Sequence, residues 1–79
     1  MGTVAAFGPR PGEDPYVWVE RLKAYYLAEG IDSPPMRLAI CHFHEWATWD
    51  LHDEEHHRLS REQMRQAAEA ALARALAQA

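Results

Sequence analysis

The chain has 79 residues, with 12 acidic and 8 basic side chains and a formal net charge of −4. This balance disfavours DNA or RNA as the main partner, because neutralising phosphates requires a surface rich in lysine and arginine. A chain this short buries only about 60 to 65% of the surface that its unfolded state exposes, so we expect one small domain stabilised by a metal, by self-association or by close aromatic packing.

Cysteine content and hydropathy indicate in which cellular compartment the protein is expected. The single cysteine, Cys41, excludes an internal disulfide and gives no sign of an oxidising compartment. No apolar run approaches the roughly 20 residues that span a bilayer. The first residues also lack the basic and apolar regions of a signal peptide. We therefore expect a cytoplasmic protein that makes no membrane contact.

The N-terminal third predicts an arm followed by a helix. Residues 1–13 form the arm, because two glycines and two prolines between positions 8 and 12 are unfavourable in a helix. Asp14 is a good N-cap and Pro15 suits the first helical position, which predicts a helix over 15–29 that ends at Gly30. Its apolar face comprises Trp18, Val19, Leu22, Tyr25 and Tyr26.

A second helix is expected over 34–51, with an extension to 57 left open. Ser33 is the candidate cap and Pro34 occupies the first helical position. Beyond Leu51 the segment 52–58 contains no apolar residue, which suits an exposed last turn or a loop. The apolar arc comprises Met36, Ala39, Ile40, Phe43, Trp46, Ala47 and Leu51.

A third helix is predicted over 61–78. Ser60 and Gln63 form the pattern of a capping box. From Ala67 onward, alanine occupies eight of thirteen positions, a composition with very high helix propensity. The narrow apolar face of small residues should lie tightly on the other helices or pair with its own copy. The predicted fold is all-α: a small three-helix bundle over 14–79 with an extended N-terminal arm.

Four side chains of the second helix suggest metal binding. If this helix continues to 57, Cys41, Glu45, His52 and His56 fall on one side of it, and these residue types are ligands that zinc prefers. Cys41 and Glu45 are one turn apart, as are His52 and His56. The two pairs are separated by about 10 Å at 1.5 Å per residue, so one ion cannot reach both. A zinc site would therefore use His52 and His56 together with ligands from elsewhere.

Catalysis by Cys41 is disfavoured. His42 is its direct neighbour and His44 lies three residues on, and adjacent helical residues point about 100° apart, so His42 is poorly placed to take the thiol proton. The sequence also contains no phosphate-binding loop and no glycine-rich nucleophile turn. We expect a protein that is not an enzyme.

Aromatic residues of the second helix suggest a partner surface. Trp46 lies at the edge of the apolar arc and Trp49 outside it, with Leu38 nearby and His52 one turn beyond Trp49. Tryptophan is enriched at the centres of interfaces, and exposed apolar patches mark partner sites. These four residues are therefore the predicted contact residues, with core packing of Trp49 against the third helix as the alternative.

Part of the N-terminal half resembles the start of the capsid domain in retrotransposon Gag proteins. The matching positions are Phe7, Pro9, Glu13, Asp14, Trp18, Arg21, Tyr25, Tyr26, Gly30 and Ile31. Fewer than half of the residues take part. The rest of the sequence contains neither the pattern of further capsid helices nor a CCHC zinc knuckle, so no function is inferred from the resemblance.

Three classes of function remain from the sequence. The first is a non-enzymatic helical protein-interaction module that associates with itself and acts as an adaptor or regulator. The second is a zinc-binding regulatory or structural domain that uses His52 and His56. A DNA-binding helix-turn-helix around Gly30 is disfavoured, because the second helix would be the reading helix and carries several acidic residues.

Overall fold

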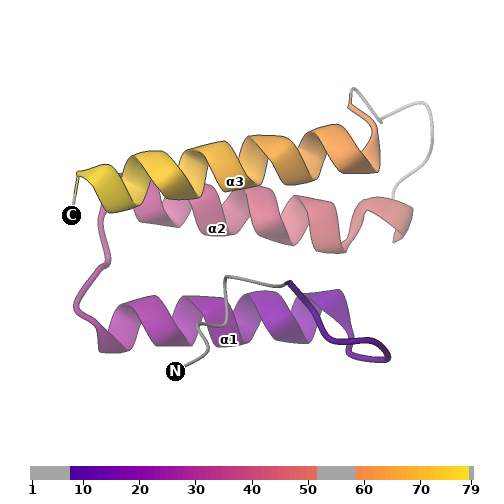
Figure 1. The fold of residues 1–79 in the computed structure, drawn as a ribbon, viewed down its shortest axis with the longest axis horizontal. Helices are drawn as coiled ribbons and strands as arrows, with labels where there is room; N and C mark the ends of the chain where they lie inside the picture. Colours follow the sequence, from indigo (N-terminus) through magenta and orange to yellow (C-terminus); the bar gives the residue numbers. More distant parts are fainter. Residues whose placement is uncertain (1–7, 52–58, 79) are drawn as a thin grey trace.

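A computed structural model describes the chain over residues 8–51 and 59–78. Three α-helices follow one another, and each runs antiparallel to the one before it (Figure 1). The described part of the chain contains no β-strand, so the prediction of an all-α three-helix bundle is confirmed. The helices are α1 (Pro15–Ala28), α2 (Pro34–Ala47) and α3 (Arg61–Ala77), and a single 3₁₀ turn, Trp49–Leu51, follows α2.

Side-chain caps fix the start of every helix. The Asp14 carboxylate accepts from the backbone N–H of Tyr16 at 2.8 Å, and the Ser33 hydroxyl accepts from Met36 at 3.3 Å. Ser60 and Gln63 form the predicted reciprocal capping box. These caps satisfy backbone N–H groups that have no partner inside the helix. The predicted helix starts are therefore confirmed.

Gly30 ends α1 as expected. Its φ of 80° lies in the left-handed region that glycine adopts without steric cost. The following N–H, of Ile31, donates to the carbonyl of Tyr26 at 2.9 Å, which is the hydrogen bond of a Schellman motif. This compact turn reverses the chain, so that α2 returns alongside α1 (Figure 1).

The second helix is shorter than predicted. It ends at Ala47, and the Thr48 hydroxyl donates to the His44 carbonyl at 2.9 Å. Leu51, expected on the apolar arc, is 82% exposed, so the prediction of an α-helix to Leu51 is wrong. A continuous helix would have carried Asp50 toward the core, whereas after the turn its carboxylate accepts from the Arg61 guanidinium at 3.4 Å.

Side chains from all three helices form one core around Trp18. The Trp18 ring meets Phe43 edge to face at 5.5 Å between centroids, and meets Trp46 in the same way at 6.0 Å. This is the geometry that aromatic pairs prefer. The buried set comprises Trp18, Val19, Leu22, Tyr26, Met36, Ala39, Ile40, Phe43, Trp46, Ala68, Ala71, Leu72 and Ala75.

Helix α3 lies tightly against α2 because its inner face is mostly alanine. Ala68 and Ala75 have no exposed surface, and small side chains at a contact shorten the distance between helix axes. Arg61 and Arg65 then reach over the Trp46 ring, with their guanidinium carbons 5.5 and 5.1 Å from its centroid. Such cation–π contacts are favourable, and they shield the outer face of the indole.

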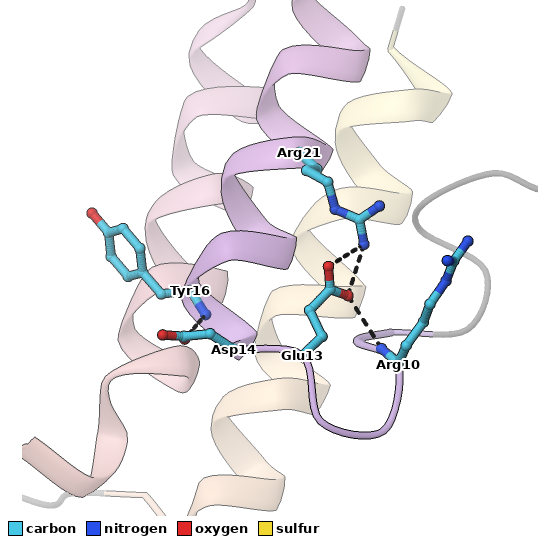
Figure 2. Close-up of polar contacts among 5 residues, drawn as sticks. All are labelled: Arg10, Glu13, Asp14, Tyr16 and Arg21. Atoms are coloured by element: carbon cyan, nitrogen blue, oxygen red, sulfur yellow. Dashed lines mark hydrogen bonds and ion pairs between the residues drawn. The ribbon is translucent and has the colours of Figure 1, made fainter.

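The arm is attached to α1 through Glu13. Its carboxylate accepts from the Arg21 guanidinium at 2.7 Å and from the backbone N–H of Arg10 at 3.2 Å (Figure 2). Gly8 is buried with a φ of 71°, and a Cβ at this position would lie 2.7 Å from the Arg65 guanidinium. Residues 8–13 of the arm therefore lie on the side of α1 that faces α3.

The overall shape is flat, with extents of 37, 27 and 15 Å. Helices α1 and α2 lie side by side across the broad view, whereas α3 overlaps α2 (Figure 1). Within the described ranges, none of the helices is both long and apolar enough to cross a membrane.

Candidate interaction surface

A groove of about 440 Å³ runs between α1 and α2, and we call it the α1–α2 groove. Its walls come from the outer sides of these helices and from the turn that joins them. In Figure 2 the Tyr16 ring points away from Glu13 and Arg21, so the groove lies on the opposite side of α1 from the arm. The lining residues are Tyr16, Lys23, Leu27, Ile31, Asp32, Met36, Arg37, Ile40, Cys41, His44, Glu45 and Thr48.

The α1–α2 groove has a buried apolar floor and partly exposed apolar walls. Met36 and Ile40, on the floor, are 3% and 7% exposed and also belong to the core. Tyr16 and Leu27, on the α1 wall, are 43% and 48% exposed. Half-exposed apolar side chains beside a hollow are typical of partner sites. Covering them with a partner removes apolar surface from water, which lowers the free energy of the complex.

One end of the groove is acidic. The Glu20 carboxylate lies 3.2 Å from Nε2 of His44, and the His44 ring stacks on Tyr16 with 4.8 Å between centroids. Glu45 lines the groove beside them. Glu45 is the carboxylate on the groove lining at this end, and Glu20 adds a second carboxylate just outside the lining. The contacts also hold the Tyr16 ring in place, which reduces the side-chain entropy lost on binding.

The other end, at the turn, is basic. Arg37 donates to Asp32 at 3.0 and 3.3 Å, and this hydrogen bond is the main reason why the pKa of Asp32 is lowered. Lys23 lies close enough to lower the same pKa further through its charge. Two cations and one anion therefore leave this end with one net positive charge, so the groove has a positive and a negative end.

Cys41 lies midway along the α2 wall. Its thiol donates to the Glu45 carboxylate at 3.5 Å. Burial raises the pKa of the Cys41 thiol, and the hydrogen bond and negative charge of Glu45 raise it further. A raised pKa keeps the sulfur protonated near neutral pH, and a protonated thiol is a poor nucleophile and a poor metal ligand. The local electrostatics therefore suit a contact residue.

A second hollow of about 380 Å³ separates α1 from α3, with Trp18 and Phe43 among its lining residues. Arg65 and Glu69 line it too, and their side chains form an ion pair at 3.0 Å. Gly8 of the arm approaches Arg65 at the same place. Contacts within the chain thus already occupy part of this hollow, so the α1–α2 groove is the stronger candidate for a partner.

The contact residues expected from the sequence are dispersed in the structure. Trp46 is 5% exposed and belongs to the core, so little of its ring is available to a partner. Trp49 is half-buried, and its indole N–H donates to the Leu59 carbonyl at 3.1 Å. Leu38 is 50% exposed on α2. His52 lies outside the described residues.

The zinc hypothesis concerns a segment that the structure does not describe. His52 and His56 both lie within residues 52–58, so their predicted role stays a prediction. Over residues 8–51 and 59–78, no three side chains of His, Cys, Asp or Glu come together as a metal site would require. Cys41 and Glu45 do face each other as their spacing predicted.

Sequence reasoning did not find the α1 wall of the groove. Tyr16, Glu20, Lys23 and Leu27 recur at spacings of four, three and four residues, which places them on one side of the helix. That stripe begins and ends with an apolar residue outside the predicted core face. The spacing was the available signal, but two charged residues inside the stripe made it look like an ordinary solvated face.

Comparisons of the chain with protein-family models, with curated proteins and with solved structures gave no match. No family match therefore supports the resemblance of residues 7–31 to Gag capsid domains.

Proposed function

We propose that the protein is a non-enzymatic helical protein-interaction module that associates with itself and acts as an adaptor or regulator. The observation that carries the proposal is the α1–α2 groove, with its apolar floor and the half-exposed Tyr16 and Leu27 on its wall. A hydrophobic centre with a charged rim is the usual anatomy of a protein–protein interface.

The size and shape of the molecule support self-association. A short chain buries a small fraction of its surface, and oligomerisation is a common remedy. The broad side of the molecule measures 37 by 27 Å, which is sufficient for the roughly 800 Å² per partner that a standard interface buries. The raised pKa of the Cys41 thiol supports the non-enzymatic part of the proposal, because it disfavours a nucleophilic thiolate.

Two matched variants test which surface associates. Leu27, on the groove wall, and Leu38, on the α2 surface outside the groove lining, are 48% and 50% exposed. We expect Leu27→Glu to weaken self-association at least about tenfold, because the interface would bury an unpaired charge. Leu38→Glu should have a smaller effect, because Leu38 lies beside the groove but outside its lining. Sedimentation equilibrium measures both, and circular dichroism checks that the variants remain helical.

If Leu38→Glu weakened self-association more than Leu27→Glu, the interface would instead lie on the α2 surface near Leu38 and Trp49, where the sequence predicted contact residues. A monomer at every concentration would rule out self-association. The measurement is repeated with a chelator and with added zinc, because a chelator-dependent mass, lost in His56→Ala, would support the zinc hypothesis in its place.

A further inference from the structure

A stripe along the groove side of α1 is complementary to its own reverse. Three of its members line the groove, and the fourth, Glu20, borders it through its contact with His44. In order the stripe presents Tyr16, Glu20, Lys23 and Leu27: apolar, acidic, basic, apolar. Its outer members are equally far from its midpoint, and so are its inner members. A second copy of the stripe laid against the first in the opposite direction therefore pairs Tyr16 with Leu27 and Glu20 with Lys23.

The stripe on the α2 wall has the same property. Arg37 and Glu45 each lie one helical turn from Cys41, on either side of it, and all three residues line the groove. Reversal about Cys41 places Arg37 of each copy against Glu45 of the other copy. Cys41 then meets its own counterpart.

The midpoints of the two stripes lie at the same level along the groove. Tyr16 and Glu20 both contact His44, with 4.8 Å between ring centroids and 3.2 Å between polar atoms respectively. The His44 contacts define one level along the groove. On α1, one turn from that level toward Gly30 reaches the midpoint of the stripe. On α2, one turn in the same direction reaches Cys41. One axis across the groove can therefore relate both stripes to their reversed copies.

Building on the proposed self-association, we infer that the occupant of the α1–α2 groove face is a second copy of this chain, docked antiparallel. A twofold axis crosses the face at the level of Cys41, so that α1 packs on α1 of the second copy and α2 on α2. Closed dimers of this kind use the same patch on both subunits, which therefore has to be self-complementary.

The charges of the groove select this direction. In the antiparallel arrangement the basic turn end of each groove meets the acidic end of the other. A twofold axis parallel to the helices would instead lay α1 on α2 of the second copy, bringing Lys23 near Arg37 and Glu20 near Glu45. Like charges facing each other across an interface are unfavourable, and opposite charges set its register.

Cross-linking through Cys41 tests the position of the axis. The chain has no other cysteine, and cysteines close to a twofold axis lie close to each other. A short bismaleimide should link two native chains through Cys41 in high yield at concentrations where the dimer forms. The matched control moves the cysteine to the exposed side of α3, away from the groove, as Ala70→Cys in a Cys41→Ser background, and should give little linked dimer.

A charge swap tests the direction of docking. Arg37→Glu alone and Glu45→Arg alone should each weaken the dimer on the order of tenfold, because each creates two like-charge contacts at the interface. The double variant carrying both changes should return to near the original affinity. Arg74→Glu on α3 controls for the change in net charge and should leave the affinity unchanged.

The outcomes separate the arrangement from the function. Cross-linking at Cys41 together with recovery in the double variant supports the antiparallel dimer. A dimer that forms without cross-linking at Cys41, or without recovery in the double variant, overturns this arrangement but leaves self-association intact. A chain that stays monomeric overturns both.

Discussion

The indole N–H of Trp49 donates a hydrogen bond to the backbone carbonyl of Leu59, with 3.1 Å between nitrogen and oxygen. The donor lies in the 3₁₀ turn after α2, and the acceptor is the residue before Ser60, the cap of α3. One side chain thus connects the end of one helix to the start of the next. The hydrogen bond therefore holds the end of the α2 region next to the start of α3.

Replacement of Trp49 by phenylalanine should destabilise the fold. Trp49→Phe keeps most of the apolar ring but removes the N–H, leaving the Leu59 carbonyl without this donor, and we expect a loss of about 1 kcal/mol. Urea denaturation followed by circular dichroism measures it. Leu51→Ala in the same turn is the control and should change stability by less than about 0.5 kcal/mol, because Leu51 is 82% exposed. Equal midpoints for both variants would contradict this role of Trp49.

Enlarging the alanine contact of α3 should also destabilise the protein. Ala68 has no exposed surface, and α3 lies close to α2. Leucine at this position would force the helices apart, at a cost of about 1–3 kcal/mol. Ala70→Leu on the exposed side of the same helix is the matched control and should be nearly neutral. A chain that tolerated Ala68→Leu as well as Ala70→Leu would show that the contact is not tight.

Two glycines of the arm separate backbone strain from side-chain contact. Gly8 and Gly12 both have positive φ, 71° and 83°, so alanine at either position should cost about 1 kcal/mol through strain alone. At Gly8 the new Cβ also meets the flexible end of Arg65, whereas nothing lies within 4 Å at Gly12. Gly8→Ala should therefore be the more destabilising in thermal unfolding, and the reverse order would argue against the arm lying on α3.

The reactivity of Cys41 should report its surroundings. Because its thiol pKa is raised by burial and by Glu45, the pH midpoint for alkylation by iodoacetamide should be higher in the folded chain than in urea. Glu45→Gln should lower the folded midpoint part of the way, since burial remains. By linkage, stability contributed by this thiol persists below the unfolded pKa and falls as the pH rises through the folded value. A lower midpoint in the folded chain would contradict the raised pKa.

Local chemistry made the helix starts predictable. Asp14 with Pro15, Ser33 with Pro34, and Ser60 with Gln63 each carry their signal within a few residues of the chain. The hydrogen bonds of the structure follow these signals directly. Gly30 was predictable for the same reason, because the left-handed conformation that ends many helices favours glycine, which has no Cβ.

The end of α2 and the groove were not predictable in this way. The apolar spacing continued to Leu51, but the helix ends at Ala47, where the N–H and the hydroxyl of Thr48 both donate to the His44 carbonyl, and the chain turns before Asp50 reaches the core. The α1–α2 groove depends on how α1 sits against α2 and on which side α3 covers. No short segment of sequence encodes that arrangement, so the sequence pattern pointed to the tryptophans as contact residues.

The edge-to-face contact of Trp18 with Trp46 also gives the protein an optical signal of its own. The two rings lie on different helices, 6.0 Å apart, and are 2% and 5% exposed. Any event that separates α1 from α2 would bring the Trp18 indole, and the side of Trp46 that it covers, into water and shift the emission to longer wavelength. Emission from the unlabelled chain therefore reports whether α1 is docked, independently of the helix content that circular dichroism measures.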